Sequence, residues 1–407
     1  MKKHSTLALA VLMLCPNLVW AQSAVTFEQA LASTLSSHPV IQGKRSAQVA
    51  AQADRKGAEW LRYPTPSIEA TTQGSGNDNG LLRLDQPLWT GGRITAAIDA
   101  AGSRLSSADA AVDESTLDLS LRVIAVYSEA LRQQAKMQYA QSGVDEHEKL
   151  LGMIRRRVEH EVSSQTDQRL AESRLYQAVN DLALTKQAYR NAIAQLGQLC
   201  GCAVDAISER GVSAQLDAQN LDDVLSEALA YSPALRRLKF DEEAADADIA
   251  AKRSAYSPQL SLRLEKSAGD VQTSRALLVL QAQPGAGLSA ISGVDAAIAR
   301  REAARMAREA AERDARDRAT LDWNEWQSAR LRFDNSKLSR TMSTQVFESY
   351  ARQYAIGRKS WIEVLNAVRE ASLAEFSLED ARSQMVAASL RLRAQTGKLT
   401  MNEGLKP

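Results

Sequence analysis

The sequence predicts a mainly α-helical protein in which two tandem repeats each combine long helices with one short β-hairpin. The first observation is an apolar periodicity typical of helices, which runs from Arg93 to about Glu161 and again from Ala290 to about Ile356. The second is period-two alternation in the short runs that precede both helices. The third is the recurrence of proline and serine landmarks at a nearly constant offset, which indicates an internal repeat.

The joint between strand and helix is clearest in the segment LLRLDQPLWTGGR. Leu82 and Leu84 alternate with polar residues, as expected for a strand with one apolar face. Pro87 has no N–H to donate, so we expect it to end the ladder. Gly91 and Gly92 can adopt backbone angles that other residues avoid, and helical spacing begins directly after them.

The first residues have the features of a secretory signal peptide. Lys2 and Lys3 precede an apolar run from Leu7 to Val19, and Ala21 provides the small residue at a cleavage point. The run is too short for a membrane span. We therefore expect residues 1–21 to be removed and the mature chain to lie outside the cytoplasm.

Strand and turn signals divide the rest of the chain. The first repeat is expected over residues 22–200, with strands at about 67–73 and 81–89 and a helical tip near 158–167. A linker over 201–219 precedes the second repeat, 220–400, with strands at about 259–266 and 274–283 and a tip near 354–363. Residues 401–407 form a tail.

The register of the repeat is preserved over its whole length. Pro233 follows Pro39 by 194 residues (233 − 39), and Ser360 follows Ser164 by 196 (360 − 164). Both serines precede an acid by three residues, the spacing of a helix capping box. Coincidence is a poor explanation for this agreement, so we interpret the chain as two copies of one plan.

Several function classes find no support in the sequence. The net charge of +1, from 50 basic and 49 acidic residues, argues against a nucleic-acid partner. His147 and His160 are not at the i, i+4 spacing of a zinc-binding helix, and we expect no enzyme, metal or cofactor. Cys200 and Cys202 either form a disulfide in an oxidising compartment or remain two thiols.

The predicted strands have the length that crosses a bilayer when tilted. Four strands cannot close a barrel, and an open sheet edge cannot lie in lipid because its backbone groups would lack partners. Identical chains must therefore share one barrel, and three copies would give twelve strands. Aromatic residues flank the strands on the helix side, as in an interfacial belt: Trp60, Tyr63, Trp89 and Tyr256.

The doubled plan resembles the TolC family of outer-membrane factors, through PLWTGGR at residues 87–93 and YAIGRKS at residues 354–360. The resemblance covers essentially the whole mature chain. It implies a homotrimer with a twelve-strand barrel in outer-membrane lipid and an α-helical tunnel through the periplasm of a Gram-negative bacterium. It also implies docking on a periplasmic adaptor and an inner-membrane pump, either an ABC transporter or a proton-driven pump. The second joint, with Pro284 and Gly285, departs from the family because it lacks the aromatic residue and the Gly-Gly-Arg sequence.

Resemblance assigns the functional residues to the two helical tips. The adaptor-docking residues are expected to be Val162, Ser163, Ser164, Gly357, Arg358, Lys359 and Ser360. A periplasmic gate would use Lys359, Glu363 and Asn366, although the family commonly has an acid at the last position. The alternative is that Lys359 and Glu363 form an ordinary pair on a helix surface.

Three functions remain in view. The first is the exit channel for type I secretion of a large polypeptide, such as an adhesin or toxin, favoured by the compact chain and the absence of an obvious apolar ligand site. The second is an outer-membrane factor for drug or metal efflux. The third is a soluble periplasmic coiled-coil adaptor or scaffold, which would have no need of strands with apolar outer faces.

Overall fold

The computed structural model describes residues 24–73, 77–210, 216, 220–268, 273–282 and 289–399. The expected signal peptide, the tail at 401–407, and Pro284 and Gly285 of the second joint lie outside these residues.

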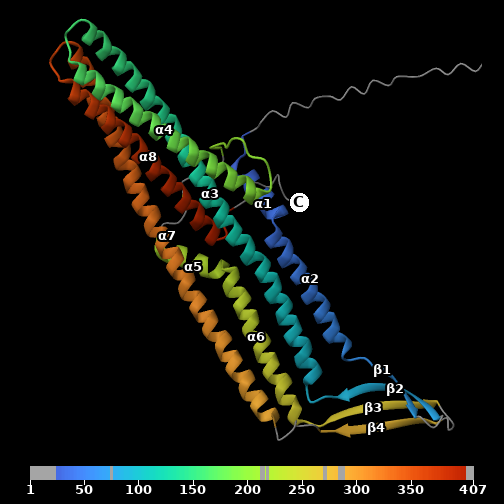
Figure 1. Ribbon diagram of the computed structural model, residues 1–407. Helices are drawn as coiled ribbons and strands as arrows, with labels where there is room; N and C mark the ends of the chain where they lie inside the picture. The colour runs from blue at the N-terminus through green and yellow to red at the C-terminus, as the bar shows by residue number, and fades with distance from the viewer. Residues whose placement is uncertain are drawn as a thin grey trace, which may run out of the picture.

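The chain consists of two copies of one series of elements, as the sequence predicts (Figure 1). The first copy contains α1 (Phe27–Ser37), α2 (Pro39–Trp60), β1 (Thr65–Gln73), β2 (Asn77–Trp89), α3 (Arg93–Glu159) and α4 (Gln165–Cys200). The second contains α5 (Leu221–Tyr231), α6 (Pro233–Arg253), the short 3-10 helix η1 (Ser254–Tyr256), β3 (Gln259–Ala268), β4 (Ser274–Gln281), α7 (Ser289–Ala355) and α8 (Trp361–Gln395).

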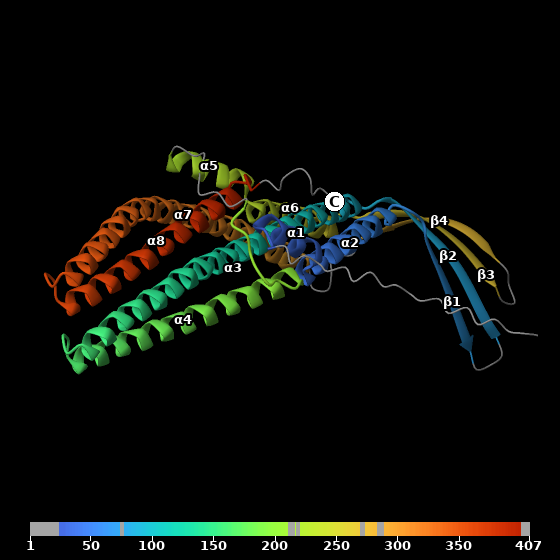
Figure 2. The same ribbon diagram turned by 90° about the horizontal axis from the view of Figure 1, so that it is seen from above.

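The molecule is elongated, with the β-sheet at one end and two helical tips at the other (Figures 1 and 2). Helices α3 and α7 each contain 67 residues, which corresponds to about 100 Å at 1.5 Å per residue. The two tips are the α3–α4 and α7–α8 connections, which lie at the same end of the molecule. In the part of the chain that the structure describes, no helix combines the length and apolar character needed to cross a membrane.

The helices form a wall with two free edges. Toward the tips the order is α4, α3, α8, α7, and toward the sheet it is α2, α3, α6, α7. Ion pairs join neighbouring helices. The Nε atom of Arg237 on α6 lies 2.5 Å from Oε2 of Glu114 on α3, and the Nε atom of Arg308 on α7 lies 2.8 Å from Oε2 of Glu242 on α6. Helix α7 therefore forms one edge along its whole length, while α4 and α2 form the other.

The sheet has the order β1-β2-β3-β4, with every neighbouring pair antiparallel. Leu84 faces Leu264 across the β2–β3 ladder, and Leu264 faces Ala276 of β4, so these three residues share one face of the sheet. The opposite face contains cross-strand ion pairs. Arg83 lies 3.2 Å from Glu265, and Arg263 lies 2.6 Å from Asp85.

Pro87 does not end the β2 ladder, and that prediction is wrong. Pro87 pairs with Ser261, and the register then shifts so that Trp89 pairs with Leu260. The shift is a β-bulge, a position where a strand tolerates proline. Because Trp89 now lies opposite Leu260, the bulge turns its indole onto the apolar face, whereas strict alternation would place it on the polar face.

Other boundaries differ by a few residues. Strand β2 begins at Asn77 instead of Leu81, and β4 ends at Gln281 instead of Gln283. Helix α1 begins at Phe27, because Thr26 is an N-cap whose side chain accepts a hydrogen bond from the Gln29 backbone N–H.

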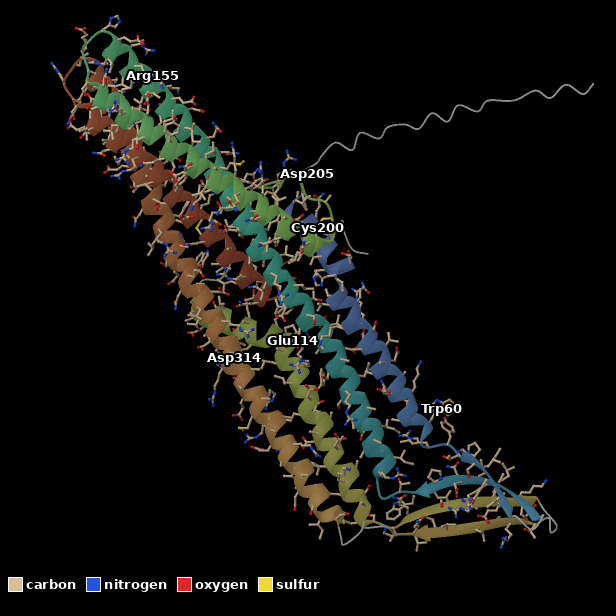
Figure 3. The ribbon with its side chains drawn as sticks, in the orientation of Figure 1. Trp60, Glu114, Arg155, Cys200, Asp205 and Asp314 are labelled. Atoms are coloured by element: carbon tan, nitrogen blue, oxygen red, sulfur yellow. A yellow bond between two sulfur atoms is a disulfide. The ribbon has the colours of Figure 1, made fainter. Side chains whose placement is uncertain are left out.

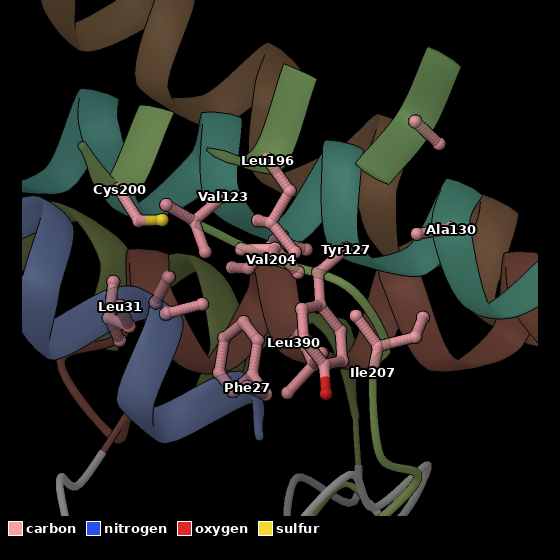
Figure 4. Close-up of a cluster of buried hydrophobic side chains, with 14 residues drawn as sticks. Phe27, Leu31, Val123, Tyr127, Ala130, Leu196, Cys200, Val204, Ile207 and Leu390 are labelled. Carbon is pink, nitrogen blue, oxygen red and sulfur yellow. The ribbon is translucent and has the colours of Figure 1, made fainter. Parts of the chain in front are cut away.

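The main core lies midway along the molecule, where α1 covers the junction of α3, α4 and α8 (Figure 4). Phe27 packs edge-on against Tyr127, with ring centroids 5.5 Å apart. The Tyr127 hydroxyl oxygen lies 2.6 Å from the carbonyl oxygen of Ser208, which holds the start of the linker on the core. Cys200 and Cys202 form a disulfide at the end of α4, which resolves the choice that the sequence leaves open (Figure 3).

Candidate functional site

The strand-to-helix joint depends on two glycines with positive φ, as the sequence predicts. Gly91 has φ of 59° and Gly92, the N-cap of α3, has φ of 88°. A Cβ at Gly91 would lie 2.5 Å from the Cβ of Ser257, just after η1 of the second repeat, whereas a Cβ at Gly92 would meet nothing within 4 Å. The two repeats therefore touch at Gly91.

We expect Gly91→Ala to reduce the thermal stability of the assembled protein more than Gly92→Ala. Both changes impose about 1 kcal/mol of left-handed backbone strain, but only the Gly91 variant also forces Ser257 to move. Thermal unfolding of the two purified variants measures the difference. Equal stability of the variants would contradict the close approach.

The apolar face of the sheet is uncovered in one chain. Ile68, Leu82, Leu278 and Leu280 are 82%, 48%, 68% and 69% exposed. Soluble proteins rarely leave a contiguous apolar surface of this kind open to water, so the face needs a partner or a lipid environment. At the helix end of the sheet the aromatic residues are also exposed, and they are Trp60, Tyr63, Trp89 and Tyr256.

The two helical tips have the same backbone geometry. Gly357, with φ of 77°, follows α7, and Glu161, with φ of 59°, stands at the equivalent place after α3. At each tip the amide of the next residue donates to a carbonyl five residues back, Val162 to Arg157 at 2.8 Å and Arg358 to Gln353 at 2.9 Å. Both tips thus end in a left-handed C-cap that glycine adopts without strain.

We expect Glu161→Gly to stabilise the first tip by about 1 kcal/mol, because it removes the penalty of a side chain at positive φ. Hydrogen exchange of the amides of residues 157–163 should slow. Gly357→Ala is the reciprocal control and should speed exchange at the second tip. Faster exchange at the first tip of Glu161→Gly would contradict the expectation.

Both predicted capping boxes are confirmed. Ser164 and Asp167 cap α4, and Ser360 and Glu363 cap α8, each pair bonded reciprocally through side chain and backbone. The backbone at the start of α4 and at the start of α8 is therefore held in place by local hydrogen bonds.

Glu363 has a second partner, because Lys359 Nζ lies 2.7 Å from its Oε1 atom. This hydrogen bond, together with those from the Ser360 backbone and side chain, lowers the pKa of Glu363 to about 2. The Lys359 ammonium also lies 4.3 Å from the centroid of the Tyr350 ring. In one chain, the charges of Lys359 and Glu363 are therefore paired with each other at the surface of the tip.

Most of the remaining tip residues face solvent, and Ser163 is half-buried. Val162 is 61% exposed, Gly357 and Arg358 are exposed, and Asn366 is exposed one turn along α8 from Glu363. Beneath this surface lies an apolar cluster that includes Ile154, Tyr354, Trp361 and Val364. The sequence did not single out this support, because its members come from helices whose pairing is non-local.

His147 is a further group that sequence reasoning set aside. It is buried at the edge of a cleft of about 120 Å³ between α3, α4 and α8. Burial lowers the pKa of His147, and the charge of Arg174 on α4 lowers it further, while Glu146 opposes the shift. The folded protein therefore holds this imidazole neutral.

As the pH falls, His147 of the unfolded chain is protonated near pH 6.5, the ordinary pKa of histidine. The folded chain binds this proton only at a lower pH, because its pKa at His147 is lowered. We therefore expect the free energy of unfolding to fall as the pH drops below about 6.5, by at most about 1.4 kcal/mol per pH unit. His147→Gln should remove this part of the pH dependence in thermal unfolding. The exposed His160→Gln is the control, and an unchanged pH profile for His147→Gln would contradict the assignment.

Comparisons with known proteins agree with this architecture. The model of the family described as outer membrane efflux protein matches residues 30–202 and 224–398, one segment in each structural repeat. No curated protein sequence matches the chain significantly. Among solved structures, the outer membrane protein VceC from Vibrio cholerae is 16% identical with a TM-score of 0.80, over 91% of this chain and 96% of that one.

Two further structures share the fold. CusC, from a study of folding and transmembrane channel formation, is 16% identical with a TM-score of 0.81, over 97% of this chain and 98% of that one. The open state of the Neisseria gonorrhoeae MtrE outer membrane channel is 17% identical with a TM-score of 0.79, over 92% and 90% of the two chains. The resemblance to TolC-family channels is thereby confirmed. The chain belongs to the outer membrane efflux protein family, whose members are transport channels and not enzymes.

Proposed function

We propose that this protein is the outer-membrane exit duct of a tripartite export system. The observation that carries the proposal is the separation of two unlike ends: a sheet with an exposed apolar face and a pair of capped, exposed helical tips. The 67-residue helices between them are about 100 Å long, enough to carry a conduit from a membrane across a wide aqueous space.

The working form in this proposal is a homotrimer. Strands β1 and β4 each have one unpaired edge, which can lie in lipid only when neighbouring chains pair with them. The free helical edges also have exposed apolar side chains, Val179 and Leu184 on α4 and Leu331 and Leu338 on α7. Joining α7 of one copy to α4 and α2 of the next would cover them, and three copies would supply a twelve-strand barrel.

The tips are then the periplasmic end, where an adaptor docks and an inner-membrane pump supplies the energy. The exposure of Val162, Gly357 and Arg358 leaves them available for contact, and the capping boxes hold the backbone beneath them. A closed resting state would use Lys359 and Glu363, whose mutual ion pair would have to exchange for partners in neighbouring copies when the tube narrows.

For the substrate we favour a large polypeptide over a small molecule. One cleft of about 230 Å³ places the charged groups of Glu114, Arg237 and Arg318 beside apolar side chains such as Leu117 and Leu121, and so differs from the predominantly apolar pockets that retain a drug. The description of the family as efflux proteins favours the alternative, drug or metal export. A soluble scaffold is not favoured, because it would leave the apolar face of the sheet exposed to water.

Deletion of the gene tests the function and the substrate together. Loss of a large secreted protein from the medium, restored by the wild-type gene, supports polypeptide export. Normal secretion with increased sensitivity to drugs or metals would overturn the polypeptide and favour the efflux alternative. Recovery of the protein as a monomer in the periplasmic fraction, instead of as detergent-dependent trimers in the outer-membrane fraction, would overturn the duct itself.

A photo-crosslinking residue in place of Arg358 tests the partner. Capture of an adaptor that co-purifies with an ABC transporter supports polypeptide secretion, whereas an adaptor that co-purifies with a proton-driven pump supports efflux. The same probe at Arg275, on β4 at the opposite end of the molecule, is the matched control and should capture neither.

A further inference from the structure

A groove of about 530 Å³ opens beside the strand-to-helix joint, and neither the apolar sheet face nor the tips include it. Residues of the joint, α6 and α7 line it, among them Ile249, Arg253, Ile298 and Arg301. Gly91 and Ser257, the point where the two repeats touch, also line it. The groove therefore lies where the sheet meets the helices, between the last turns of α6 and the N-terminal part of α7.

The charge of the groove is favourable for an anion. Arg253 is exposed, and no acidic partner for it is found among the described residues. Arg301 is 2.9 Å from Asp246, which also lines the groove, and 3.8 Å from Glu302. These three side chains are 39%, 54% and 48% exposed, so both ion pairs are weak and can be displaced. A guanidinium offers a planar pair of donors that matches a phosphate group.

The groove also has an apolar component. Ile249 is only 8% exposed and Ile298 is 43% exposed, so the groove contains an aliphatic surface beside the two cations. The exposed rings of Trp60, Trp89 and Tyr256 mark the same end of the helices, and amphipathic rings favour the depth of lipid headgroups. A ligand that fits has a phosphate beside a hydrocarbon chain.

We infer that this groove binds an anionic phospholipid from the periplasm-facing leaflet, with its phosphate at Arg253 and Arg301 and part of an acyl chain against Ile249 and Ile298. The inference rests on the proposed insertion of the sheet in a membrane, because that insertion puts the groove at headgroup depth. The lipid would thereby fix the vertical position of the joint relative to the bilayer.

Native mass spectrometry of the detergent-purified, full-length assembly tests the site, with phosphatidylglycerol and phosphatidylcholine as probes. Wild-type protein should retain phosphatidylglycerol preferentially. Arg253→Gln/Arg301→Gln should bind it about tenfold or more weakly, the change expected when a charge-assisted hydrogen bond is lost. Arg253→Lys/Arg301→Gln should bind phosphatidylglycerol more strongly than Arg253→Gln/Arg301→Gln, because it keeps the positive charge at position 253, but more weakly than Arg301→Gln alone, because an ammonium lacks the planar pair of donors.

Lys252→Gln/Arg300→Gln is the matched control, because it removes the same charge from the adjacent positions, which do not line the groove. Equal loss in both double variants would overturn the groove in favour of diffuse surface charge. Unchanged lipid binding with altered ion selectivity in planar bilayers would overturn it by placing the arginines in the tunnel. Assemblies that insert and export normally but show no preference between the two lipids would refute the site alone, whereas failure to insert would refute the proposed function.

Discussion

Replacing Leu82, Leu84, Leu262 and Leu264 together by lysine is expected to abolish assembly in the outer membrane. These four positions lie on one face of β2 and β3, opposite the face with the Arg83–Glu265 and Arg263–Asp85 ion pairs. A lysine on the lipid face of a membrane strand costs about 2–4 kcal/mol at the bilayer midplane and less near the interfaces. Four such costs are comparable with the whole free energy of unfolding of an ordinary domain, about 5–15 kcal/mol.

The measurement is the amount of heat-resistant, detergent-extracted trimer in the outer-membrane fraction. Leu84→Lys/Leu264→Lys should already reduce it. Ser67→Lys/Ser261→Lys is the matched control, because both serines lie on the polar face of the same sheet. Normal trimers from the fourfold variant would show that the apolar face is not the lipid face. Loss of trimers in the serine control as well would attribute the defect to strand pairing.

Local chemistry explains what the sequence could predict of this fold. The alternation around Leu82 and Leu84 specifies which residues share a face, and the serine caps of α4 and α8 depend on residues three positions apart. The repeat adds a second, independent copy of each signal. That is why both helical tips and both hairpins could be placed from the sequence within a few residues.

The errors have physical causes as well. Proline has no backbone N–H to donate, so the sequence predicts that the strand ends at Pro87. In the structure a β-bulge lies at this position, and the strand continues beyond it. The bulge also moves Trp89 to the apolar face of the sheet. Glu161 gives no glycine signal, although its backbone has the same left-handed conformation as Gly357. The order of the helices around the wall, and with it the clusters beneath the tips and the groove at the joint, depends on contacts between residues far apart in sequence. No single-sequence pattern contains that information.

Gly357→Trp is expected to abolish export while leaving trimers intact. Gly357 lies in the connection between α7 and α8, and a Cβ built there would meet nothing within 4 Å, so an indole can project from the tip without entering the core. The backbone cost is that of any side chain at φ of 77°, about 1 kcal/mol, and the capping box of Ser360 remains. The large effect on export should therefore come from the blocked surface.

Gly357→Ala separates the two contributions, because it has the same backbone strain without the bulk. It should export normally, whereas the tryptophan variant should lose export and the crosslink from position 358 to the adaptor. Heat-resistant trimers and single-channel conductance in planar bilayers should be unchanged in both, since the substitution lies outside the helical wall. Normal export by Gly357→Trp would remove the docking role of this tip. Loss of export in Gly357→Ala as well would assign the defect to the backbone of the C-cap, because the methyl group adds strain but almost no volume that an adaptor could meet.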